Sequence, residues 1–148
     1  MHPALRDQII TILDGARDMT IATMREDGYP QATTVSYVHD ELTIYFGCGV
    51  SSQKAINIGR HSKVSLAINL PYSNWHEIRG LSLAGRAFLV KDPTEREKIR
   101  QLLLQRFQQV AQYASSGSVD VVHFRITPAV VSILDYSKGI GHTEFIRI

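Results

Sequence analysis

The segment Gly49-Val50-Ser51-Ser52-Gln53-Lys54 carries the residues best suited to hold an anion. It joins an expected strand to an expected short helix, so that Lys54 falls in the first helical turn. Free backbone N–H groups and the positive end of the helix dipole favour an anion there. Ser51 and Ser52 add hydroxyl donors, and Lys54 adds a full positive charge. The spacing predicts a phosphate site; the alternative is an N-cap serine beside a solvated lysine.

The other chemically reactive side chains are isolated. Cys48 is the single cysteine and has no neighbouring histidine, so we expect a buried structural thiol rather than a nucleophile. Phosphate-loop, dinucleotide-binding and zinc-protease motifs are absent. No two histidines have the spacing of metal ligands on one helix: His2, His39, His61, His76, His123, His142. The sequence therefore predicts no metal and leaves catalytic residues unassigned.

Several loop and strand residues are further candidates for ligand contact. Trp75 and His76 follow Pro71 in an expected loop, where an aromatic ring stacks on a planar ligand or, as its more common role, packs against protein. His142 ends a glycine-rich turn. The sequence does not place these residues relative to a ligand, nor does it place Arg79 or Arg86.

Composition restricts the class of protein. The chain has 148 residues, 44% hydrophobic and 20% charged, with a net charge of +2, which predicts one globular domain over residues 1–148. So small a charge argues against a nucleic-acid coat or a membrane-surface helix. No apolar run approaches a membrane span, and the N-terminus lacks a signal peptide's apolar core. With a single cysteine, we expect a reducing cytoplasm.

Hydrophobic periodicity supplies the elements that would position these residues. Helices are predicted over residues 3–16, about 52–58, and from Asp92 to about 111, with loops over 71–78 and 115–118. Strands are predicted over residues 19–24, 31–38, 42–46, 64–70, 81–90, 119–126, 130–136 and 142–148.

Turn residues refine this outline. Asp27-Gly28 predicts a hairpin, His39-Asp40-Glu41 a polar turn, and Gly47-Cys48-Gly49 the end of the third strand. Gly85 predicts a bulge or a close backbone approach, and Pro128 divides two strands. Because the first connections are too short for parallel crossovers, we expect a mainly β fold: an antiparallel sheet closing into a small barrel with outer helices.

The order of these segments resembles the pyridoxamine 5′-phosphate oxidase-like flavoproteins, the FMN-binding split β-barrels. The order and spacing hold over about residues 5–91, and more loosely through Phe124-Arg125-Ile126-Thr127-Pro128. The matching segments are Asp27-Gly28-Tyr29-Pro30, Thr33-Thr34-Val35, Ile44-Tyr45-Phe46, Ser52-Gln53-Lys54-Ala55-Ile56-Asn57-Ile58, Lys63-Val64-Ser65-Leu66 and Gly85-Arg86-Ala87.

The resemblance implies a homodimer with FMN at the subunit interface. The residues it places along the flavin are Thr33, Thr34, Val35 and Cys48. The residues it places at the phosphate are Ser52, Gln53 and Lys54, in agreement with the local reading of that turn, which adds Ser51.

The sequence also departs from the pattern of the true oxidases. Thr33 stands where a basic residue often helps to hold the phosphate, and Gly80 replaces a glutamine that meets the flavin. The tail over residues 137–142 lacks the tryptophan- and arginine-containing segment that serves the flavin and the vitamin B6 substrate. Oxidation of vitamin B6 is therefore not expected.

We expect an FMN-dependent oxidoreductase that acts on an unidentified small molecule, with hydride chemistry supplied by the flavin. One alternative is a non-catalytic flavin or haem binder, in which His76 or His142 would be an axial ligand. A second alternative is a deazaflavin-dependent reductase, whose cofactor phosphate would occupy the same turn.

Overall fold

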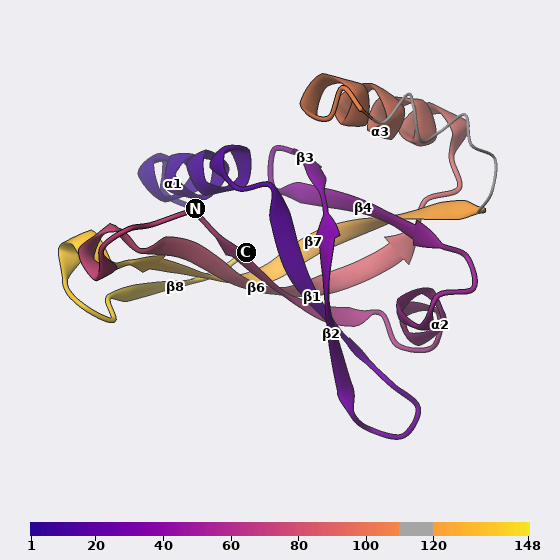
Figure 1. Ribbon diagram of the computed structural model, residues 1–148, viewed down its shortest axis with the longest axis horizontal. Coiled ribbons are helices and arrows are strands. Elements are labelled where there is room, and N and C mark those ends of the chain that lie inside the picture. The colour runs from indigo at the N-terminus through magenta and orange to yellow at the C-terminus, as the bar shows by residue number, and fades with distance from the viewer. Residues whose placement is uncertain (110–119) are drawn as a thin grey trace.

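Eight antiparallel strands form one curved sheet in the computed structural model, which describes residues 1–109 and 120–148 (Figure 1). The strand order is β2-β1-β5-β6-β7-β4-β3, and β8 pairs with β7. The strands are β1 Asp18–Met24, β2 Pro30–Ser36, β3 Val38–Asp40, β4 Thr43–Gly49, β5 Lys63–Asn69, β6 Arg79–Leu89, β7 Val121–Asp135 and β8 Thr143–Arg147. The helices are α1 Pro3–Gly15, α2 Gln53–Arg60 and α3 Pro93–Arg106, with short 3-10 turns η1 Trp75–Glu77 and η2 Tyr136–Lys138.

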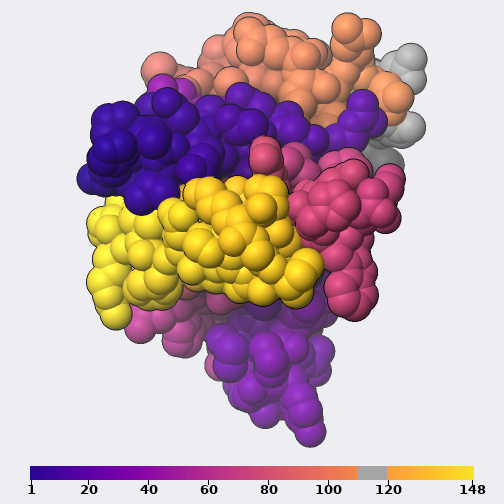
Figure 2. Space-filling view, turned by 90° about the vertical axis from the view of Figure 1, so that its left-hand side faces the viewer, coloured from indigo at the N-terminus to yellow at the C-terminus, as the bar shows by residue number. Residues whose placement is uncertain are grey.

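The sheet is a split antiparallel barrel, as the sequence predicted. Every strand pair is antiparallel, and the strictly alternating burial of β5 puts Val64, Leu66 and Ile68 on the inner face. In the described residues, no hydrogen-bonded ladder joins β2 to β3 at the two ends of the strand order. The Asp27-Gly28 turn closes the β1–β2 hairpin, which stands out from the body in the space-filling view (Figure 2).

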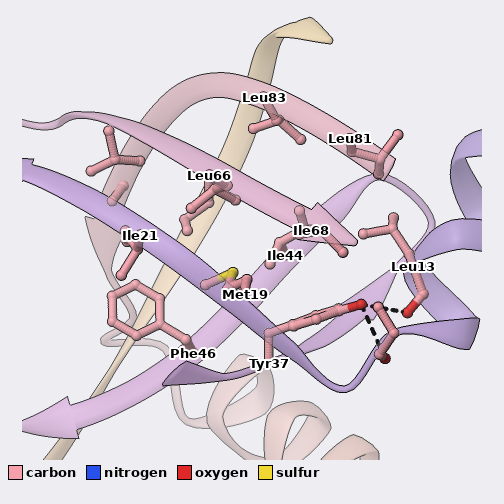
Figure 3. Close-up of a cluster of buried hydrophobic side chains, with 14 of the residues drawn as sticks. Leu13, Met19, Ile21, Tyr37, Ile44, Phe46, Leu66, Ile68, Leu81 and Leu83 are labelled. Carbon is pink, nitrogen blue, oxygen red and sulfur yellow. Dashed lines mark hydrogen bonds between the residues drawn. The ribbon is translucent and has the colours of Figure 1, made fainter. Parts of the chain in front are cut away.

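The inner face carries the hydrophobic core shown in Figure 3. The rings of Phe46 and Phe124 stack with their centroids 5.5 Å apart. Tyr37 is fully buried, and its hydroxyl donates to the carbonyl oxygens of Leu13 at 2.6 Å and Ala16 at 3.2 Å. The core therefore ties the C-terminal end of α1 directly to the sheet.

Helix α3 covers a second, smaller apolar cluster on the far side of β3 and β4. Ile99 of α3 packs there with Val38, Tyr45 and Val90. At the end of α3 the guanidinium of Arg106 lies 4.8 Å from the Tyr37 ring centroid and donates to carbonyls at the end of α1. A cation at that end of α1 also complements the helix dipole. In the view of Figure 1 both helices lie above the strands, α1 against the core and α3 against the outer face of β3 and β4.

The polar turn predicted over residues 39–41 is present but shifted, and occupies residues 41–42. His39 and Asp40 belong to β3, and the chain reverses at Glu41, which has a φ of 54°. The predicted strand over 31–38 is interrupted at Tyr37, because the burial of its ring against α1 separates β2 from β3.

The glycines at 47 and 49 and the proline at 128 do not interrupt their strands as the sequence predicted. Gly47-Cys48-Gly49 does not end the third strand: β4 continues to Gly49 because β7 pairs with it throughout. Likewise Pro128 does not divide two strands, since β7 is continuous through a bulge there. Opposite this bulge lies Gly85, whose predicted close approach is confirmed: a Cβ there would lie 2.4 Å from the carbonyl oxygen of Thr127.

The remaining boundaries agree with the sequence to within a few residues. The predicted Asp92 cap is confirmed, since its carboxylate accepts from the Glu95 backbone N–H. Helix α3 ends at Arg106, so its predicted extension to about residue 111 is wrong at 107–109: Phe107 is the C-cap with an extended backbone, and a turn follows. Residues 110 and 111 and the loop expected at 115–118 lie outside the described part of the chain. The loop over 71–78 contains η1. Among the described residues, no helix has both the length and the apolar character needed to cross a bilayer.

Candidate functional site

The turn between β4 and α2 presents a capped helix start. Ser52 is the N-cap, and its hydroxyl oxygen accepts from the Ala55 backbone N–H at 3.3 Å. Of the two serines that could have capped the helix, Ser52 does so and Ser51 is exposed. Because the Ser52 oxygen is used as an acceptor, its O–H is still able to donate to a bound anion.

Lys54 follows in the first turn of α2. Its side chain is half-buried, and no carboxylate of the described residues lies within salt-bridge distance of it. The first turn of α2 contains no acidic residue. A cation at this end opposes the helix dipole by about 0.3–1 kcal/mol. An anion bound beside Lys54 would offset that cost and meet the helix dipole favourably.

A buried polar network fixes α2 against the β1–β2 hairpin. Asn57 is fully buried, and its amide nitrogen donates to Thr23 Oγ1 at 3.0 Å and to Gln31 Oε1 at 3.3 Å. Gln53 in turn donates to Asn57 Oδ1 at 2.7 Å. With these bonds Asn57 determines how α2 is rotated, and hence where Lys54 lies. The sequence interpretation missed this role of Asn57, although a polar residue between Ile56 and Ile58 was a usable signal.

Thr33 contributes a hydroxyl that lacks a partner. Gln31, Thr33 and Val35 alternate on the inward side of β2, and Gln31 already contacts α2 through Asn57. The Thr33 hydroxyl oxygen is buried, and no residue in the described part of the chain hydrogen-bonds to it. A buried unsatisfied hydroxyl costs about 1–3 kcal/mol, so this position favours a ligand that accepts a hydrogen bond.

The structure separates the residues expected along the flavin. Val35 packs against the core, and the Cys48 thiol is also part of it, with 9% of the residue exposed. Thr34 instead points to the opposite, exposed side of β2, where it lies across from Thr20. Thr33 and Val35 therefore share the inward face of β2, whereas Thr34 presents only its backbone to that side. Gln53 is committed to Asn57.

The other candidates lie elsewhere on the sheet. Arg79 begins β6 and lies 3.6 Å from Asp135, beside a cavity of about 290 Å³ under α1. Burial alone would raise the pKa of Asp135, but hydrogen bonds from Ser137 and the charge of Arg79 hold it below its usual value. His76 is exposed in η1, and His142 Nε2 lies 3.3 Å from Glu144 Oε1. In residues 1–109 and 120–148, no three His, Cys, Asp or Glu side chains are placed to hold a metal.

Solved structures share this fold at low sequence identity. A haem-binding protein from Mycobacterium smegmatis superposes with a TM-score of 0.82 at 20% identity, covering 99% of this chain; the chain spans only 59% of that protein. A conserved hypothetical protein from Mycobacterium tuberculosis gives 0.79 at 24% identity, covering 97% and 91% of the two chains. General Stress Protein 26 from Bacillus anthracis gives 0.70 at 20% identity, covering 97% and 98%.

Sequence comparison identifies the family. No curated protein matches this sequence. The family model described as pyridoxamine 5′-phosphate oxidase matches residues 5–135, which is most of the chain and includes both the β2 strand and the turn before α2. The chain therefore belongs to the pyridoxamine 5′-phosphate oxidase family.

Proposed function

We propose that the protein is an FMN-binding oxidoreductase of this family that acts on a small molecule other than vitamin B6. The observation that carries the proposal is the half-buried Lys54 at the N-terminus of α2, with no carboxylate of the described residues paired to it. A phosphate monoester has a charge of about −1.5 to −2 at neutral pH and needs several donors to leave water. Lys54, the hydroxyls of Ser51, Ser52 and Thr33, and the free N–H groups of the helix are donors of the required kind.

The chain's own residues would bind and orient the cofactor rather than transfer protons. When bound, FMN supplies hydride chemistry at its N5 atom, which requires no protein acid or base. If they meet the cofactor, Val35 and Cys48 would present apolar surface that excludes water, and Thr34 would present backbone groups. This division of work agrees with a chain that has no recognisable catalytic motif.

Substitution of Lys54 tests the proposal. Truncating one member of a buried charge pair costs about 2–5 kcal/mol, so Lys54→Ala should weaken FMN binding at least tenfold. Lys54→Arg keeps the charge and should retain more of the affinity. Lys91→Ala removes an exposed lysine elsewhere and is the matched control. FMN is titrated into each apo protein, with circular dichroism as the folding check. Equal affinity of folded Lys54→Ala and the parent would contradict the proposed site.

Haem binding is a second candidate, favoured by the arrangement of His142. The Glu144 carboxylate lies 3.3 Å from His142 Nε2 and would orient the ring, which leaves Nδ1 as the nitrogen that would bind the haem iron. The haem-binding protein that shares the fold supports the same candidate. The visible spectrum of the purified protein separates flavin, haem and deazaflavin, and His142→Ala should abolish a haem spectrum but leave a flavin spectrum unchanged.

We further propose a cytoplasmic homodimer with the cofactor at its interface. A flavin has more apolar surface than so small a barrel covers alone. The protomer also leaves large apolar side chains exposed, among them Tyr29 at 71%, Trp75 at 69% and Phe145 at 61%. Light scattering should give twice the chain mass of 16.6 kDa at micromolar concentration, and a monomer mass would contradict the proposal.

A further inference from the structure

Two cations lie directly opposite each other on the outer face of the sheet. Lys63 of β5 is the register partner of Arg86 of β6, and both side chains are exposed on the same side. Like charges in this arrangement destabilise a sheet. His61 lies beside them, and no Asp or Glu lines the cleft they share in the described part of the chain. The sequence pattern does not reveal this cluster, because it depends on the register of two strands.

The cations stand at one end of a cleft whose floor carries small side chains. The cleft has a volume of about 690 Å³, within the range of small-molecule sites. Its floor includes Ala22, Ser65 and Ala84, which follow one another across β1, β5 and β6 in register. Met24 and Pro30, the last paired residues of the β1–β2 hairpin, form an apolar side. Small side chains in a row allow a planar group to lie flat on the sheet.

This cleft is separate from the phosphate turn. The turn lies at the N-terminal end of α2, at Ser52, whereas His61 is the C-cap residue at the other end. The helix has 8 residues, which corresponds to about 12 Å of rise. A cation at the C-terminal end of α2 would stabilise the helix dipole, but Arg60 in the last turn already supplies one. The dipole therefore does not explain the presence of Lys63 and Arg86.

We propose that this cleft binds a small molecule with a flat apolar body and one anionic group, a carboxylate, phosphate or sulfonate. The body would lie on the row of small side chains, and the anion would neutralise Lys63 and Arg86. Arg86 is already held in place, since its Nη1 donates to Ser62 Oγ at 3.0 Å. His61 Nδ1 accepts from the Lys63 backbone N–H, so a neutral ring carries its proton on Nε2 as a further donor. The site goes beyond the proposed function and uses none of the residues of the phosphate turn.

Binding of two fluorescent probes to the protein in its solution assembly tests the site. The probes are 8-anilinonaphthalene-1-sulfonate and its neutral analogue N-phenyl-1-naphthylamine, which lacks the sulfonate. Lys63→Gln combined with Arg86→Gln should weaken binding of the sulfonate probe at least tenfold and change the affinity for the neutral probe less than twofold. Ala84→Phe fills the floor and should weaken both probes. Lys54→Ala and Lys91→Ala should leave both affinities unchanged, which separates this site from the phosphate turn.

Thermal unfolding without probe gives a second reading. Because the two cations repel each other across the β5–β6 ladder, Lys63→Gln alone should raise the midpoint temperature of unfolding. The proposal would be overturned if the sulfonate probe did not bind saturably to the parent protein, or if the double charge variant lost affinity for both probes equally. It would also be overturned if Lys54→Ala lost affinity for the sulfonate probe. Saturable binding that Ala84→Phe does not weaken would place the probe elsewhere and also overturn it.

Discussion

Replacing Thr33 by valine should have opposite effects on the free protein and on its FMN complex. Valine keeps the shape of threonine but exchanges the buried hydroxyl, which has no hydrogen-bond partner among residues 1–109 and 120–148, for a methyl group. Removing an unsatisfied buried hydroxyl recovers about 1–3 kcal/mol, and a buried methyl adds about 0.8 kcal/mol. After allowance for imperfect fit, we expect the free energy of unfolding of apo Thr33→Val to rise by about 1–2 kcal/mol. For a chain of this length, each 1 kcal/mol raises the midpoint by about 2–4 °C.

The affinity for FMN should fall in the same variant. A hydrogen bond to a charged group contributes about 1.5–3 kcal/mol, so loss of the Thr33 donor should weaken FMN binding by about 10- to 100-fold. Urea unfolding of the apo protein measures the first effect, and FMN titration measures the second. If affinity falls tenfold, saturating FMN should reduce the variant's stability advantage by about 1.4 kcal/mol.

Thr34→Val is the matched control for both measurements. Thr34 is the same residue type on the same strand, but its side chain is exposed on the opposite face. It should therefore change neither stability nor affinity by more than about 0.5 kcal/mol. A Thr33→Val protein that is less stable without FMN and binds FMN as tightly as the parent would refute the assignment of Thr33.

Three further predictions concern the scaffold. Asn57→Leu leaves Thr23, Gln31 and Gln53 without their shared partner and should lower the free energy of unfolding by about 2–4 kcal/mol in urea titration; a change below about 0.5 kcal/mol would contradict the network. Gly85→Ala forces a Cβ to within 2.4 Å of the Thr127 carbonyl and should cost about 1–3 kcal/mol, whereas Gly59→Ala, in open space, should not. Burial raises the pKa of Tyr37 to about 12, so the unfolded chain loses this proton first and stability should fall between about pH 10 and 12, by up to about 2–3 kcal/mol. Denaturation of the parent and of Tyr37→Phe across this range should show a steeper loss in the parent, and parallel curves would contradict the prediction.

Elements whose signals are local were predictable from the sequence. The alternation in residues 64–70 marks one buried face, and β5 has that burial pattern. The cap at Asp92 and the hairpin at Asp27-Gly28 depend on residues a few positions apart, and both are confirmed. The anion-site interpretation of the β4–α2 turn placed Ser52 and Lys54 correctly at a helix start for the same reason, although binding there stays a prediction.

Features that depend on distant partners were not predictable in this way. Glycines at 47 and 49 signal a break, but pairing with β7, more than seventy residues later, keeps them in the strand. Tyr37 interrupts its predicted strand because its hydroxyl meets the end of α1. The Lys63–Arg86 pair and the burial of the Thr33 hydroxyl likewise follow from strand register and packing, which no local pattern encodes.

Asn57 and Lys54 illustrate how α2 divides positioning from binding. All of the hydrogen bonds of the Asn57 side chain go to protein groups on α2 and the β1–β2 hairpin, so it acts on a ligand only through the orientation of the helix. Lys54 makes no such hydrogen bonds to the hairpin and is half-buried, so its positive charge is available to an anion. Its loss should therefore lower affinity at nearly constant stability, while loss of Asn57 should lower stability first. The hairpin that Asn57 holds also supplies Met24 and Pro30 to the outer cleft, so this single buried amide positions α2 between both candidate sites.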